Sequence, residues 1–186
     1  MTNKSLKIYQ FKIILKGIKP AIWRRIHVLG NYNFWDLHVA IQDAMGWYDC
    51  HLHQFEMKTH EAFGIIIGTE ECDELEQKAK IAKYFLYPKD KANYEYDFGD
   101  GWEHEIVLEK ILPAVIGNKY PQCIAGKRAC PPEDCGGVWG YEDLLKVIAN
   151  PRHPEYEERM EWLGGDFNPE EFDPKLVVFE DPKAYA

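Results

Sequence analysis

The sequence of 186 residues has no long hydrophobic run and no excess of basic charge. Because no apolar run approaches the roughly 20 residues that a transmembrane helix needs, the sequence excludes a membrane-spanning segment. Lysine and arginine number 22 against 31 aspartates and glutamates, which gives a formal net charge of −9. This charge argues against a nucleic-acid binder with a generally basic surface, since neutralising phosphates needs clustered basic side chains. The N-terminal stretch lacks the apolar core of a signal peptide, so we expect a cytoplasmic protein.

Established catalytic motifs are also missing. The chain contains no GxSxG, P-loop, dinucleotide-binding glycine pattern or HExxH sequence. No Cys-x-x-Cys pair occurs, which argues against a redox pair. An odd number of cysteines without an export signal predicts reduced thiols. The five cysteines are Cys50, Cys72, Cys123, Cys130 and Cys135.

The chain instead contains strand and helix patterns that are mixed without a regular βαβ rhythm, which predicts an α+β fold. We expect a mostly antiparallel sheet packed by helices. The length suits a single domain over residues 1–186, with a core at about 7–173 and an acidic C-terminal tail at 166–186.

The first elements are predicted by clear local signals. Apolar and polar residues alternate over 9–15 and again over 21–29, which predicts a hairpin with Arg24 on the buried face of its second strand. Asn33 as an N-cap, apolar residues at helical spacing and a final Gly46 predict the next helix.

Residues 93–110 predict a second hairpin, rich in aromatic side chains. A three-residue Gly-Asp-Gly loop would place Tyr96 opposite His104. In this register His104 lies on the buried, aromatic face and Asp97 projects from the opposite face.

The remaining chain carries weaker signals. A strand is expected at 51–57, paired with an apolar run at 63–67. Residues 69–80 are acidic and then basic, which is typical of a solvated surface without a function. Residues 113–137 form a Gly/Pro/Cys-rich irregular excursion, and irregular segments of that length are often functional. Helices are expected at 141–149 and 154–163, with a short last helix from Asp173.

Two histidines form the first candidate metal site. His51 and His53 are two residues apart on an expected strand, so their side chains would share one face. Two imidazoles at that spacing can bind one metal ion. The alternative is that both are histidines at the edge of the core, hydrogen-bonded to the backbone or to a neighbouring strand.

Three cysteines form the second candidate. Cys123, Cys130 and Cys135 offer thiolates for a zinc ion, with one ligand still needed. The alternative is that aromatic packing organises this loop and the thiols are small buried apolar groups.

Carboxylates of the central hairpin complete the candidates for chemistry. Asp97, Asp100 and His104, together with His51 and His53, are candidate ligands or acid/base groups. Asp100 sits in the expected turn, where aspartate is favoured for local hydrogen bonds. Asp97 would face away from His104, which weakens a simple triad.

Four stretches together resemble the plasmid pRiA4b ORF-3-like family, also called the MM3350-like fold. They are KGIKPAIWRRIHV, FWDLHVAIQDAMGWYDCHLHQF, YEYDFGDGWEHEIVLE and CPPEDCGGVWGYEDLL. The resemblance implies a single α+β domain found in bacteria and archaea, often near plasmid or transposon genes, without an established activity. Polar and aromatic residues inside these stretches would line a cleft or form a buried polar network. The candidate cleft residues are Arg24, Trp47, Tyr96 and Trp102.

Three functions follow as hypotheses. The first is a binding or protein-interaction module with a protein partner, associated with mobile-element or plasmid functions. The second is a metal-dependent, zinc-type enzyme, hydrolytic in character, that uses His51, His53 and nearby carboxylates. The third is a DNA-associated protein with a local basic face. The sequence assigns no oligomeric state and no substrate.

The uneven spread of charge keeps the third hypothesis open. Residues 1–60 hold 8 basic and 4 acidic side chains, whereas residues 133–181 hold 4 and 14. The N-terminal hairpin is therefore mildly basic although the whole chain is acidic. Its basic side chains are Lys12, Lys16, Lys19 and Arg25.

Overall fold

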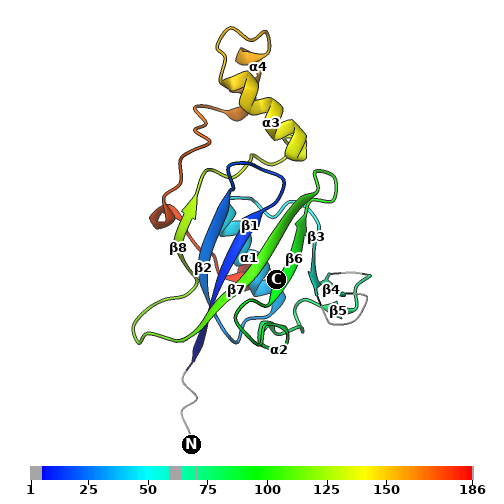
Figure 1. Ribbon diagram of the computed structural model, residues 1–186, viewed down its shortest axis with the longest axis vertical. Helices are drawn as coiled ribbons and strands as arrows, with labels where there is room; N and C mark the ends of the chain where they lie inside the picture. Colours follow the sequence, from blue (N-terminus) through cyan, green and yellow to red (C-terminus); the bar gives the residue numbers. More distant parts are fainter. Residues whose placement is uncertain (1–5, 59–63, 70, 186) are drawn as a thin grey trace, which may run out of the picture.

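The computed structural model describes residues 6–58, 64–69 and 71–185 and shows an α+β fold built on one eight-stranded sheet (Figure 1). The strand order is β5-β4-β3-β6-β7-β1-β2-β8, and every pair is antiparallel except β4–β5. The strands are β1 Lys7–Leu15, β2 Trp23–Leu29, β3 His53–Met57, β4 Ile65–Gly68, β5 Glu74–Leu75, β6 Lys91–Tyr96, β7 Trp102–Pro113 and β8 Gln122–Lys127.

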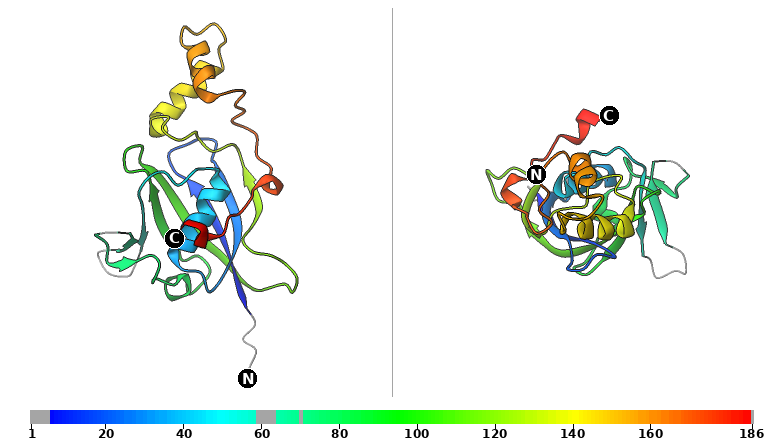
Figure 2. Two further views of the ribbon diagram at one scale, coloured as in Figure 1. Left: turned by 180° about the vertical axis from the view of Figure 1, so that it is seen from behind. Right: turned by 90° about the horizontal axis from the view of Figure 1, so that it is seen from above.

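The helices occupy two places. Helix α1, Phe34–Met45, packs on one face of the sheet, and α3 and α4 stand together beyond one end of it (Figures 1 and 2). The other helical elements are α2 Ile81–Tyr84, α3 Gly137–Ile148, α4 Tyr156–Leu163, and the 3-10 helices η1 Pro174–Leu176 and η2 Pro182–Tyr185. None of the helices in the described part of the chain has the length and apolar character that crossing a bilayer requires.

The first hairpin and α1 confirm the local signals. Strands β1 and β2 pair, and Arg24 is only 1% exposed. Asn33 and Asp36 form a capping box, and Gly46 ends α1 in the left-handed conformation that glycine adopts without strain. The helix buries Phe34, Leu37 and Ile41 against the sheet. The N-cap, the apolar spacing and the final glycine seen in the sequence therefore predict a central element of the core.

The predicted register of the central hairpin is wrong by two residues. Tyr96 lies opposite Trp102, and Tyr94 lies opposite His104. The cause is Asp97, which leaves the strand at φ 57° and accepts a bond from the Gly101 amide, so the turn is longer than expected. Because the shift is even, the buried face is unchanged and His104 has no exposed surface.

Two stretches that the sequence indicates as irregular contain strands. The excursion at 113–137 includes β8, which extends the sheet beyond β2. The stretch at 69–80 includes β5, and most of its described residues are exposed as expected, but Glu76 is completely buried. The strand expected at 51–57 begins only at His53.

The chain returns from α4 along the body and ends on α1 (Figure 2). The Trp35 indole donates to the Pro182 carbonyl at 3.1 Å, and the Glu180 amide donates to the Asp43 carboxylate at 3.0 Å. These two bonds attach the C-terminal segment to α1.

Candidate functional site

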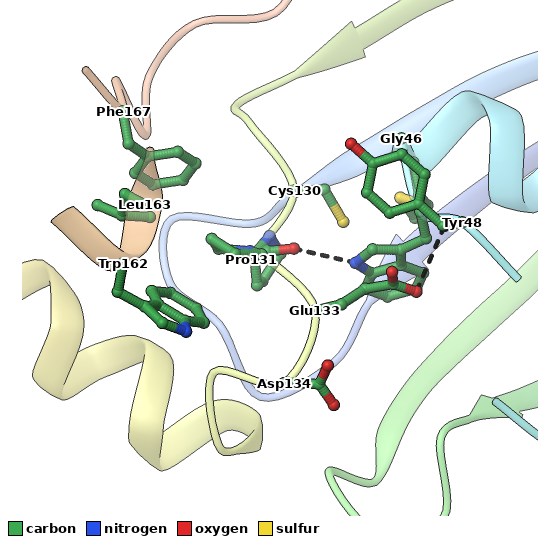
Figure 3. A pocket seen from close by; sticks show the side chains of 12 residues that line it. Gly46, Tyr48, Cys130, Pro131, Glu133, Asp134, Trp162, Leu163 and Phe167 are labelled. Carbon is green, nitrogen blue, oxygen red and sulfur yellow. Dashed lines mark hydrogen bonds between the residues drawn. The ribbon is translucent and has the colours of Figure 1, made fainter. Parts of the chain in front are cut away.

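A groove of about 490 Å³ opens between α4 and the residues that follow α1 (Figure 3). Its volume lies in the range of ligand-binding clefts. Trp162 and Leu163 form one wall, and Tyr48 and Glu133 stand on the other. The full lining is Met45, Gly46, Trp47, Tyr48, Cys130, Pro131, Pro132, Glu133, Asp134, Trp162, Leu163 and Phe167.

The termination of α1 at Gly46 positions two aromatic side chains. Trp47 is 6% exposed, donates its indole N–H to the Pro131 carbonyl at 2.9 Å and stacks on Tyr96. Tyr48 points outward and is 80% exposed. In the groove, Trp47 is therefore held in place by its bond to Pro131, whereas the neighbouring Tyr48 ring is exposed and can contact a ligand.

Glu133 is held in a defined orientation. Its Oε1 atom accepts bonds from the Tyr96 hydroxyl and from the Tyr48 amide, and the Cys50 amide donates to the same hydroxyl. Burial, and then the bond to Glu133, raises the pKa of Tyr96 far above its usual value, so the phenol stays protonated and donates. Within the described chain Oε2 receives no bond and remains available to a ligand.

A histidine and two aspartates converge beside this wall. His51 Nε2 lies 3.3 Å from Asp134 Oδ1 and 3.8 Å from Asp97 Oδ2. Asp134 is shared between this cluster and the groove lining. The sequence predicts that Asp97 projects from a strand face. In the structure Asp97 lies just after β6, with a positive φ angle, and its side chain therefore reaches His51.

A second cluster is buried under α1, and both of its imidazole rings are hydrogen-bonded. The His38 ring bonds the Tyr94 hydroxyl at 2.8 Å and Asp49 at 2.7 Å. The His53 ring stacks on His38 with centroids 3.4 Å apart and bonds Glu76 at 2.7 Å. Burial lowers the pKa of His38, which favours its neutral form. This network is a satisfied polar part of the core.

The two histidines predicted to share a metal ion therefore lie in different clusters. His53 is in β3 and faces Glu76 and His38, whereas His51 precedes the strand and faces Asp97 and Asp134. The alternation rule fails because the chain becomes extended only at His53. Sequence reasoning also missed Glu76, since its partner lies 23 residues away and no local pattern marks a buried carboxylate.

The three candidate zinc cysteines are not gathered around one point. Cys123 lies on β8, and among the described residues neither three-ligand cluster contains a cysteine. Burial raises the pKa values of the Cys130 and Cys135 thiols to about 12, so both stay protonated. These thiols pack against the core, as the alternative interpretation proposes.

Of the four predicted cleft residues, Trp47 lines the groove and Tyr96 supports it through Glu133. Arg24 instead donates to the Ala44 carbonyl at 2.7 Å, near the end of α1, and Trp102 is completely buried. Two of the four therefore belong to the core.

The other candidates of the central hairpin have structural surroundings. His104 is fully buried, and its Nε2 atom has no partner among the described residues. Asp100 lies in the turn, where its carboxylate accepts a bond from the Gly136 amide at 3.2 Å. Asp100 thus connects the hairpin to the loop that carries Asp134.

The expected basic face of the N-terminal hairpin is neutralised in part. Arg25 makes two bonds to the Glu109 carboxylate, and Lys16 pairs with Glu103. Both glutamates lie on β7, which neighbours β1 in the sheet. These pairs reduce the positive charge of the hairpin, whereas Lys12 and Lys19 form no ion pair within the described residues.

Comparison with known proteins gives related matches of three kinds. A family model described as plasmid pRiA4b ORF-3-like protein matches residues 7–176. Uncharacterized protein y4hQ of Sinorhizobium fredii (strain NBRC 101917 / NGR234) is 35% identical over 161 residues, which are 84% of this chain and 81% of that protein. A crystal structure of a protein of unknown function, MM3350 from Methanosarcina mazei Go1, is 51% identical. Its TM-score is 0.88, and the match covers 94% of this chain and 99% of that one.

Proposed function

The chain belongs to the plasmid pRiA4b ORF-3-like family, and from its groove we propose that it is a binding module for a protein segment that carries a basic side chain. The observation that supports this function is the combination of aromatic walls with two carboxylates. Tyr48 and Trp162 present exposed rings, while Glu133 and Asp134 supply negative charge beside them.

A lysine or arginine side chain suits this combination. A cation is attracted to the faces of aromatic rings, and its N–H groups form strong bonds with carboxylates. The net charge of −9 would also attract a basic segment over longer range. Since the family description names a plasmid reading frame, we include in the proposal that the partner acts in plasmid or mobile-element functions.

The other two hypotheses have less support. A hydrolytic enzyme that uses His51 and His53 on one metal ion conflicts with the bond between His53 and Glu76. A DNA-binding face on the first hairpin conflicts with the pairing of Lys16 and Arg25 to glutamates.

The test is retention of a peptide library with one fixed lysine or arginine, compared with the same library with glutamine at that position. All solutions contain a chelator, so that metal ions play no part. We expect the full-length protein to retain the basic library, and Glu133→Gln or Trp162→Ala to reduce affinity about tenfold or more. Retention should weaken as salt concentration rises.

Matched variants make this test specific. Trp139 is 82% exposed on α3 and Glu157 lies on the exposed surface of α4, and neither lines the groove. Trp139→Ala and Glu157→Gln should leave binding unchanged. Equal retention of both libraries, or equal loss in the Trp139 and Trp162 variants, would contradict the proposed function.

A further inference from the structure

Three separate segments bring ligand atoms to one point beside the groove. His51 follows the end of α1, Asp97 begins the β6–β7 turn and Asp134 lies in the loop before α3. Their ligand atoms all lie within 4.8 Å of one another. Asp134 also stands at the lower edge of the groove in Figure 3, so the cluster opens toward a space that a ligand can enter.

The central atom of the cluster has no hydrogen bond. His51 Nε2 is buried and unpartnered, although the Asp134 oxygen is only 3.3 Å away, because that contact is not aligned as a hydrogen bond. Two ligands held at about 2.1 Å on a tetrahedral ion are about 3.4 Å apart. The spacing between His51 and Asp134 is that of two ligands around an ion, and Asp97, at 3.8 Å from the same nitrogen, needs only a small shift.

Asp97 presents one oxygen to this point and uses the other for support. Its Oδ1 atom accepts a bond from the Gly99 amide at 2.9 Å, which fixes the carboxylate within the turn. The Oδ2 atom is the one that faces His51. Supporting bonds of this kind are typical of oriented metal ligands.

The buried cluster of His38, Asp49 and His53 provides a contrast. There each imidazole already bonds a carboxylate at 2.7 Å. An ion bound there would have to displace those bonds, whereas an ion at His51 would satisfy an atom that has none. Both clusters combine histidine and aspartate, but only the cluster of His51, Asp97 and Asp134 contains an imidazole nitrogen without a hydrogen bond.

We propose that His51, Asp97 and Asp134 bind a divalent first-row transition-metal ion, with Zn²⁺ as the representative probe. One imidazole and two carboxylates form a mixed nitrogen and oxygen donor set, which suits such ions better than Mg²⁺ or Ca²⁺. Three protein ligands leave at least one coordination position for water or for a group in the groove. This inference goes beyond the binding of a basic segment and does not depend on it.

The test is a calorimetric titration of Zn²⁺ into tag-free, full-length protein that has been treated with a chelator and dialysed. No peptide is present, so failure here is distinct from failure of the proposed function. We expect one equivalent of Zn²⁺ to bind, and His51→Gln or Asp134→Asn to lower its affinity at least tenfold. The visible absorption spectrum of bound Co²⁺ should change in the same variants, because it reports the ligands directly.

Asp49→Asn is the matched control, since the φ angle of Asp49, 55°, is close to the 57° of Asp134, and Asp49 lies in the buried cluster. Its Zn²⁺ affinity should equal that of the wild type. Asp134 is 73% exposed, so its substitution tests the site without disturbing the core. Three results would overturn the proposal: no Zn²⁺ binding, binding unchanged by both cluster variants, or binding lost only with Asp49→Asn.

Discussion

At the scale of single residues, His104 makes the free energy of unfolding depend on pH. The ring has no exposed surface, and burial lowers its pKa to about 4. In the unfolded chain an imidazole has a pKa near 6.5, so the unfolded state takes up this proton at higher pH than the folded state. The contribution of His104 to the free energy of unfolding is therefore full above about pH 6.5 and is lost as pH falls toward 4, by about 3 kcal/mol.

The variant His104→Asn tests this coupling. Asparagine can still donate toward the Tyr94 carbonyl, which the His104 ring faces at 3.3 Å. We expect the variant to be less stable than the wild type at pH 7.5 but to lose less stability between pH 6.5 and 4.5. Urea unfolding at several pH values measures both slopes. Parallel curves for the two proteins would show that His104 does not carry the effect.

Residue-scale predictions from sequence succeed where alternation alone decides burial. Arg24 and His104 lie on the buried faces that their strands predict. Alternation says nothing about partners, so the stacking of His38 on His53 and the bond from His53 to Glu76 were not predicted. The positive φ angles of Asp97 and Asp134 have no such signal either, and these two residues create the convergent cluster.

At the scale of elements, α1 is the best-specified part of the chain, and its cap offers a direct test. Asn33 accepts a bond from the Asp36 amide at 2.7 Å and donates to the Gln77 carbonyl at 3.0 Å. Asn33→Ala should lower the free energy of unfolding by about 1 kcal/mol or somewhat more. Chemical denaturation measures the loss, and Asn31→Ala is the control because Asn31 is exposed two residues earlier. An equal loss in both variants would show that the cap contributes nothing specific.

Elements are harder to predict where turn chemistry or composition conceals them. The β6–β7 register depends on a left-handed Asp97, which the expectation of a Gly-Asp-Gly loop overlooks. Strand β8 lies in a segment rich in glycine, proline and cysteine, where local composition disfavours a strand. Pairing with β2 overrides that preference, and only the folded sheet provides this partner.

At the scale of the whole molecule, the fold class and the family could be predicted from sequence, but the groove could not. Its walls come from three segments that are distant in the chain, around residues 45–48, 130–134 and 162–167. Long-range packing brings them together, so neither periodicity nor motif spacing contains this information. The aromatic rings and carboxylates on which the proposed function depends are present in the sequence, but nothing in the sequence indicates that they lie side by side.

The groove also depends on how the α3–α4 pair, residues 137–163, is attached to the sheet. The Phe172 ring lies over the Arg24 guanidinium, whose central carbon is 3.7 Å from the ring centroid. The same ring fills the space where Gly126 lacks a side chain, because a Cβ atom at that position would collide with it. Nearby, Arg128 pairs with Glu170 at 2.7 Å and the Ala129 amide bonds the Pro169 carbonyl. This contact anchors the segment that returns from α4.

Phe172→Ala should therefore loosen the α3–α4 pair without unfolding the sheet. Removal of a partly buried ring and its cation contact costs about 1–2 kcal/mol, which is enough to raise local opening of the attached helices roughly tenfold. Hydrogen exchange should accelerate in α3 and α4 but not in β1 and β7, and retention of the basic peptide library should weaken. Phe98→Ala is the control, since Phe98 is 50% exposed at the hairpin turn. Uniform acceleration throughout the sheet would show instead that Phe172 stabilises the molecule globally, and the groove would then not depend on this anchor.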